Sequence, residues 1–167
     1  AVGNPPWLKL QFEEKGLMSE VFPELSIRKV SAPKVRKLQS EFLEIKQQKE
    51  DYFEEYVGIE SSGVFMNGLQ NYPLLKGQQT NLYKCVIENG FSLISENGFL
   101  GLLHPEGVYD DPKGQPLRKE MYPRLKFHFQ FQNAFNLFAE VAHREKYGSN
   151  IYAGKKEDVS FISINNL

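Results

Sequence analysis

The chain has 167 residues, 41% of them apolar and 25% charged, which is the composition of one ordinary globular domain. Its net charge of −1 excludes a uniformly basic surface, and it contains no apolar run of about 18 residues that could cross a membrane as a helix. The single cysteine, Cys85, excludes an internal disulfide and a multi-cysteine zinc site, and it suits a reducing compartment. We therefore expect a cytoplasmic protein.

The first seven residues are unusual. The apolar pair Ala1-Val2 runs into Gly3-Asn4-Pro5-Pro6-Trp7 without an initiating Met, as if the chain began within a strand. Two consecutive prolines force a rigid, extended exit from such a strand. We expect a fragment of a longer protein, and a processed terminus or a cleaved tag is the alternative. The structural alternative for the Pro-Pro segment is a plain rigid loop.

Residues 8–30 predict short helical turns and loop. Residues 31–57 predict one helix, with Ser31 as a possible cap and Pro33 in the first turn. A seam with 3-4 spacing supports this helix, and Gly58 is its predicted end. The residues of the seam are Val35, Leu38, Phe42, Ile45, Lys49, Tyr52 and Tyr56.

Charge is unevenly distributed along this segment. Positions 26–40 hold five basic residues and no acid, whereas positions 41–60 hold seven acids. The basic residues are Arg28, Lys29, Lys34, Arg36 and Lys37. They lie at the end of the helix where the macrodipole disfavours positive charge. An anionic partner would explain this placement, and a solvated face is the simpler interpretation.

The sequence of the second half of the chain predicts helices that alternate with strands. We expect a loop over 58–77, a helix over 78–95, and a strand over 99–103 that is buried on both faces and belongs to a parallel sheet. A short helix over 116–123 precedes a half-buried strand over 125–132, and further strands follow at 150–153 and 159–165. This order indicates the α/β class.

The usual catalytic constellations are absent from the sequence. His104, His128 and His143 lack any metal-ligand spacing, and we expect His128 to be exposed and His104 to be structural. Cys85 lies on the apolar face of a predicted helix, where an inert buried thiol is expected. Asp110-Asp111 fits a polar turn better than a cation site. The sequence has no glycine-rich nucleotide loop.

The segment Asn4-Pro5-Pro6-Trp7 resembles the Asn-Pro-Pro-aromatic motif of adenine-specific DNA methyltransferases of restriction–modification systems. Such a match is expected by chance in about 0.2% of chains of this length. The resemblance continues through 81–87, 98–105 and Leu117-Arg118 to 131–138, where an Asn precedes a Phe, as in large methylase and methylase–endonuclease polypeptides. It covers the whole chain loosely and 78–141 better. Asn81 departs from the family, which often has Asp there.

The resemblance implies a Rossmann-like, S-adenosylmethionine-dependent fold of which this chain is the later half. It divides residues 1–167 into a helical insertion over 8–77 and later strands and helices over 78–167. In this interpretation Asn4, Pro5, Pro6 and Trp7 are catalytic, and Asn4 also borders the cofactor. Trp7 and Phe138, or less plausibly Phe135, stack on the target base. The basic residues of 28–37 contact DNA phosphates.

The implied partners are double-stranded DNA with a flipped adenine and the upstream half of the same polypeptide, and the fragment could also form a homodimer. We expect the fragment alone to be inactive, with no metal. Two alternatives stay open: a binding or interaction module without catalysis, and a degenerate methylase kept as a scaffold. The sequence does not specify a DNA target or an accompanying endonuclease.

Overall fold

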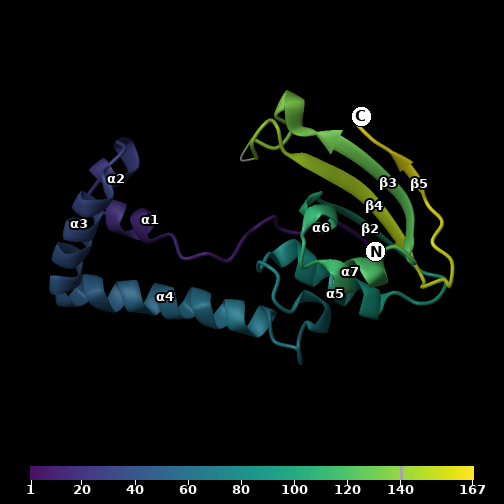
Figure 1. The fold of residues 1–167 in the computed structure, drawn as a ribbon, viewed down its shortest axis with the longest axis horizontal. Helices are drawn as coiled ribbons and strands as arrows, with labels where there is room; N and C mark the ends of the chain where they lie inside the picture. The colour runs from purple at the N-terminus through teal and green to yellow at the C-terminus, as the bar shows by residue number, and fades with distance from the viewer. Residues whose placement is uncertain (140) are drawn as a thin grey trace. The chain divides into compact units, whose positions relative to one another are not determined.

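The computed structural model describes residues 1–139 and 141–167 (Figure 1). The chain divides into two compact units. The larger unit combines Ala1–Lys9 with Phe65–Leu167, and the smaller unit is Leu10–Val64. Within the described residues, no helix is both long and apolar enough to cross a membrane.

A five-stranded mixed sheet forms the frame of the larger unit (Figure 1), with the order β1-β2-β4-β3-β5. The strands are β1 (Val2–Gly3), β2 (Phe99–Pro105), β3 (Leu125–Gln132), β4 (Lys146–Ala153) and β5 (Ile162–Ile164). The pairs β1–β2 and β3–β5 are parallel, and β4 runs antiparallel to both of its neighbours. The α/β class predicted from the sequence is confirmed.

Helices pack on this sheet and enclose its core. They are η1 (Pro73–Leu75), α5 (Leu82–Leu93), α6 (Gly107–Asp110), α7 (Gln115–Met121) and η2 (Asn133–Phe135). Helix α5 begins where Asn81 caps it, its side-chain oxygen accepting from the Tyr83 N–H at 3.4 Å. Its inner face buries Ile87 in a core that also contains Leu100 of β2 and Leu117 of α7. Burial of each such side chain contributes about 1.5–3 kcal/mol, which fixes α5 on the sheet.

Three strand predictions were wrong in detail. The strand predicted over 99–103 continues to Pro105 and buries alternate residues rather than both faces, and β4 lies beside it in antiparallel register. It is parallel to β1 only. The strand predicted over 150–153 begins four residues earlier, at Lys146, and the last one is confined to Ile162–Ile164. The strand over 125–132 is confirmed as β3, and the helix predicted over 78–95 is found as the shorter α5, which begins four residues later.

The smaller unit is helical. It contains α1 (Glu14–Ser19), α2 (Glu24–Ile27), α3 (Ala32–Glu44) and most of α4 (Lys46–Met66). Its small core consists of Met18, Leu25, Leu38 and Phe42. The short turns expected over residues 8–30 are confirmed as α1 and α2.

The single helix predicted over 31–57 was wrong. The chain becomes extended at Ile45 (φ −87°, ψ 118°), which separates α3 from α4. The bend lets Tyr52 fold back, so that its ring lies 6.4 Å from Phe42 and its hydroxyl donates to Glu14 at 2.7 Å. A straight helix would carry Tyr52 away from both partners. Ser31 occupies the cap position but makes no side-chain capping hydrogen bond.

The predicted stop at Gly58 and the predicted loop over 58–77 were also wrong in part. Helix α4 continues through Gly58 and Gly63 to Met66. Each glycine weakens a helix by only about 1 kcal/mol, which a 21-residue helix tolerates. The irregular segment therefore begins at Asn67, and η1 interrupts it.

Candidate active site

The segment Asn4–Trp7 leaves the sheet at the end of β1. The amide of Gly101 donates to the Ala1 carbonyl at 2.9 Å, and β1 runs parallel to β2 from there. Open α/β sheets bind their ligands at the carboxyl ends of parallel strands, which is where Asn4 begins. Pro5 is buried and Asn4 is exposed, so the backbone is held while the amide side chain faces outward.

Two acceptors of this segment are uncommitted. Across residues 1–139 and 141–167, no hydrogen bond uses the Asn4 side chain or the Pro5 carbonyl. Pro5 and Pro6 cannot donate hydrogen bonds, and their fixed φ angles restrict the backbone that carries both acceptors. The segment therefore presents two neutral acceptors to a ligand without first breaking internal bonds.

Trp7 is anchored beside these acceptors. Its indole N–H donates to the Leu103 carbonyl of β2 at 3.3 Å. Its ring lies 4.9 Å from Phe138, at an interplanar angle of 46°, and 5.7 Å from Tyr147 of β4. Phe138 meets Tyr147 edge-on at 5.0 Å. The three rings form an aromatic cluster in which aromatic pairs contribute about 0.5–1.5 kcal/mol each beyond their burial.

Asn133 holds the loop that carries Phe138. It is fully buried at the end of β3, and its Nδ2 donates to the carbonyls of Phe138 at 2.9 Å and Val141 at 2.8 Å. Its Oδ1 accepts from the Phe138 N–H at 3.1 Å. One side chain thus fixes both ends of the loop and sets the position of the Phe138 ring. The sequence showed Asn133 before the aromatic residues but did not indicate this role.

A cavity of about 730 Å³ lies over the segment and the loop. Its lining includes Asn4, Trp7, Leu8, Phe138 and Val141. Trp7 and Phe138 contact each other, whereas a base stacked between two rings needs about 7 Å between their centroids, twice the stacking distance of about 3.4 Å. Phe135, the less favoured stacking residue, is exposed.

The predicted phosphate-contacting residues all lie in the smaller unit and are exposed. They are Arg28, Lys29, Lys34, Arg36 and Lys37. Lys34 forms an ion pair with Glu24, and Lys37 forms one with Glu41, each at 3.7 Å. Exposed pairs of this length contribute less than about 1 kcal/mol, so these lysines can exchange partners readily.

The exposed position predicted for His128 was wrong. His128 is 8% exposed, because Glu106 and Tyr109 lie against it and β5 pairs with β3 beside it. Its Nε2 lies 3.1 Å from both carboxylate oxygens of Glu106, and its Nδ1 lies 3.1 Å from Ser163 Oγ. Burial alone would raise the pKa of Glu106, but the hydrogen bonds from His128 and Gln130 outweigh it and lower that pKa.

His104 is fully buried within the sheet. Its Nδ1 lies 2.9 Å from the Pro105 carbonyl, which can only accept, and its Nε2 lies 2.9 Å from the Tyr152 hydroxyl. These partners indicate the neutral tautomer with the proton on Nδ1. Burial lowers the pKa of His104 to about 4. His143 is exposed.

Cys85 is buried as predicted, and burial raises the pKa of its thiol to about 11. Asp111 forms an ion pair with the buried Lys84, while Asp110 is exposed. Among residues 1–139 and 141–167, no three His, Cys, Asp or Glu side chains are grouped so that they could hold a metal ion.

Comparison with known proteins gives limited similarity. No family model matches the sequence, and no curated protein matches it. Among solved structures, the fold is similar to a nuclease-deletion mutant of the Type ISP restriction–modification enzyme LlaGI, in complex with a DNA substrate mimic. The identity is 11% and the TM-score 0.48, and the match covers 98% of this chain. This chain spans 14% of the length of that enzyme.

Proposed function

We propose that this chain is part of a DNA methyltransferase that acts on the exocyclic amino group of adenine, in a restriction–modification system. The observation that carries the proposal is the pair of free acceptors at Asn4 and Pro5, beside an anchored aromatic ring. The motif that supplies them resembles that of the amino-methyltransferases.

The chemistry follows from what an amino group needs. The lone pair of adenine's exocyclic nitrogen is delocalised into the ring, so the nitrogen is a weak nucleophile. Hydrogen bonds from its two N–H groups to Asn4 Oδ1 and the Pro5 carbonyl favour a pyramidal nitrogen with a localised lone pair. Neither acceptor has to ionise, and holding the nitrogen in one orientation supplies part of the rate acceleration.

S-adenosylmethionine would supply an electrophilic methyl group, which passes to the nitrogen as the sulfonium becomes a thioether. Of the residues in this chain, only Asn4 is proposed to border the cofactor. The nitrogen then loses one proton to solvent, and no residue of this chain has to accept it.

The target base must leave the duplex to reach Asn4. Stacking on an aromatic ring contributes about 1–3 kcal/mol per base. Trp7 is the fixed stacking surface, since β2 holds its indole N–H. Phe138 has to move away from Trp7 by about 2 Å before a base can enter between them, which the Asn133-held loop would control.

An upstream segment of the same polypeptide is proposed to cover the β1 edge of the sheet. A mostly apolar groove of about 520 Å³ lies there, lined by Val2, Val86, Leu93 and Phe99 among others. Val2 and Leu93 are among the most exposed apolar side chains of the chain. A second copy of the fragment could occupy the same edge, because unpaired strands associate readily.

The test is methyl transfer by the parent polypeptide that contains these residues. Radiolabelled S-adenosylmethionine and a mixed duplex substrate give N6-methyladenine if the proposal is correct, and Asn4→Ala lowers the rate by about 100-fold or more, as loss of a hydrogen bond at a reacting centre does. Asn97→Ala, at an exposed turn position with no positive φ and outside the cavity over Trp7, is the matched control. An active parent that keeps its rate in Asn4→Ala refutes the role of Asn4. An inactive parent that still binds DNA supports the interaction module or the degenerate scaffold.

A further inference from the structure

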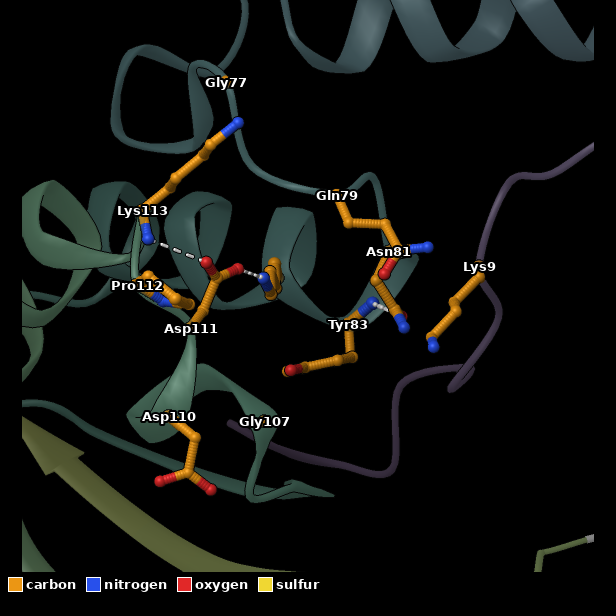
Figure 2. Close-up of a pocket in the computed structure, with 11 residues that line it drawn as sticks. Lys9, Gly77, Gln79, Asn81, Tyr83, Gly107, Asp110, Asp111, Pro112 and Lys113 are labelled. Carbon is orange, nitrogen blue, oxygen red and sulfur yellow. Dashed lines mark hydrogen bonds and ion pairs between the residues drawn. The ribbon is translucent and has the colours of Figure 1, made fainter.

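A second pocket of the larger unit lies at the N-terminus of α5 (Figure 2). Its volume is about 530 Å³, and it shares no lining residue with the cavity over Trp7. Lys9 lines it, while the preceding Leu8 lines the Trp7 cavity. The chain is fixed at this point, because Lys9 forms a β-bridge with Asn81 and the Leu82 N–H donates to the Leu8 carbonyl at 3.0 Å. Neighbouring residues of one fixed segment therefore line two different pockets.

The floor of this pocket holds an unused hydroxyl. Tyr83 is only 2% exposed, and its ring stacks on His104 at 5.6 Å. In the part of the chain that the structure describes, nothing hydrogen-bonds to the Tyr83 hydroxyl. A methyl group on Gly107 would lie 3.6 Å from this oxygen, so the glycine leaves the space beside it open. Tyr83 lines the pocket and its hydroxyl has no partner in the described residues, so an acceptor that enters the pocket can bind it.

The chemical state of this hydroxyl restricts the ligand. Burial and the negative charges of Asp111 and Glu106 raise the pKa of Tyr83, so the hydroxyl keeps its proton and can donate it. Neither carboxylate accepts a hydrogen bond from it: Asp111 is paired with Lys84, and Glu106 is paired with His128. The available partner for Tyr83 is therefore a hydrogen-bond acceptor from outside the chain.

Two lysines line the pocket on opposite sides (Figure 2). Figure 2 shows the Lys9 side chain on one side of the pocket and that of Lys113 on the other, with the carboxylate of Asp110 directed away from them. Within residues 1–139 and 141–167, neither lysine takes part in an ion pair. Asn81 uses its Oδ1 to cap α5, which leaves its NH₂ group as a further donor at the same place. The uncommitted groups are mainly donors and cations, which suits an anion rich in acceptor oxygens.

We propose that this pocket binds a phosphate group, with the Tyr83 hydroxyl as the fixed donor and Lys9 and Lys113 as flanking cations. The phosphate belongs either to a nucleic-acid backbone or to a free phosphate ion. The proposal goes beyond methyl transfer and does not depend on it, because no residue of the Trp7 cavity takes part.

The test uses the 167-residue protein and two probes: inorganic phosphate, and a fluorescein-labelled 20-base-pair duplex. Phosphate binding is followed by amide chemical shifts at constant ionic strength, and duplex binding by anisotropy. Tyr83→Phe removes one oxygen and is expected to weaken whichever probe binds by about tenfold, the size of one hydrogen bond to a charged group. Lys9→Ala is expected to lower the salt slope of duplex binding by about one.

The matched controls are Lys119→Ala, which removes an exposed lysine of α7 outside the pocket, and Tyr56→Phe in the smaller unit. Shifts at residues 81–84 with phosphate, lost in Tyr83→Phe, assign the pocket to free phosphate. If duplex binding weakens both in Tyr83→Phe and when methylphosphonates replace phosphates of the duplex, the pocket binds a nucleic-acid backbone. The proposal is overturned if neither probe responds to Tyr83→Phe, or if Lys119→Ala has the same effect as Lys9→Ala. Both readouts measure binding at this pocket rather than methyl transfer, so failure here is distinct from failure of the methyltransferase proposal.

Discussion

Replacing Asn133 with alanine removes the three hydrogen bonds that hold the Phe138 loop. The Phe138 N–H and the carbonyls of Phe138 and Val141 lose their partner at distances of 2.8–3.1 Å. Each lost bond costs about 1 kcal/mol, and more where the remaining group cannot reach water. Phe138 and Val141 are half-buried, so water replaces the lost partner only in part. We expect Asn133→Ala to lower the free energy of unfolding by about 3 kcal/mol.

The same substitution has a local readout, because Trp7 is the only tryptophan in the chain. Its ring rests on Phe138 at 4.9 Å. When the loop is released, Trp7 gains solvent, its emission shifts to the red, and acrylamide quenches it more strongly. Urea unfolding measures the global effect, and fluorescence in the absence of urea measures the local one.

Asn136→Gly is the control, because Asn136 is exposed and has φ +50°, a conformation that glycine adopts freely. It should leave Trp7 emission unchanged. If Asn133→Ala keeps the wild-type emission and a free energy of unfolding within about 0.5 kcal/mol of wild type, then Asn133 does not hold the loop.

Three further predictions concern stability and reactivity. Lowering the pH from 7 to 5 should reduce the free energy of unfolding by about 2 kcal/mol through His104 alone. The pKa of His104 is about 4 in the folded protein and about 6.5 in the unfolded chain, so only the unfolded chain gains the proton in this range. An unfolding midpoint that does not change with pH would contradict this. Gly58→Ala should raise the free energy of unfolding by about 0.5–1 kcal/mol, since a Cβ there meets no atom within 4 Å. Gly77→Ala should lower it, because Gly77 has φ +75°. Equal effects of the two substitutions in urea titrations would be inconsistent with α4 continuing through Gly58. Cys85 should resist thiol reagents at pH 8 until the protein unfolds, because burial raises its pKa to about 11, and rapid labelling of the native protein would show that the thiol is accessible.

Local patterns predicted the elements whose periodicity is complete within one segment. The alternation from Leu125 to Gln132 gave β3, and the apolar face around Cys85 and Leu93 gave α5. Ile45 shows where such reasoning stops. The seam from Val35 to Tyr56 is compatible with one helix. The bend that places Tyr52 against Phe42 is favoured by distant partners such as Glu14 and Phe12, which the seam does not reveal.

The burial of His128 and the role of Asn133 could not be predicted for a related reason. A histidine on the polar side of a strand is exposed unless another segment covers it. The strand predicted over 159–165 did not indicate that it would pair with β3, or that Glu106 and Tyr109 would lie against His128. Asn133 makes its bonds to backbone groups five and eight residues away, and the sequence of those residues does not matter for such bonds. The burial of His128 and the role of Asn133 therefore depend on which segments lie beside them in the fold, and the local residue pattern does not show this.

The distribution of unused hydrogen-bonding capacity separates structural groups from functional ones in this chain. The side chains with the richest acid–base chemistry, His104, Glu106 and His128, all find partners inside the larger unit, and those contacts hold the sheet together. Asn4 and Tyr83 carry groups without partners in the described residues, and each faces a cavity. A ligand gains most where the protein has left acceptors or donors unpaired, since it then breaks no internal bonds on entry. The two pockets that diverge at Leu8 and Lys9 are for this reason the places where substitutions should change binding more than folding.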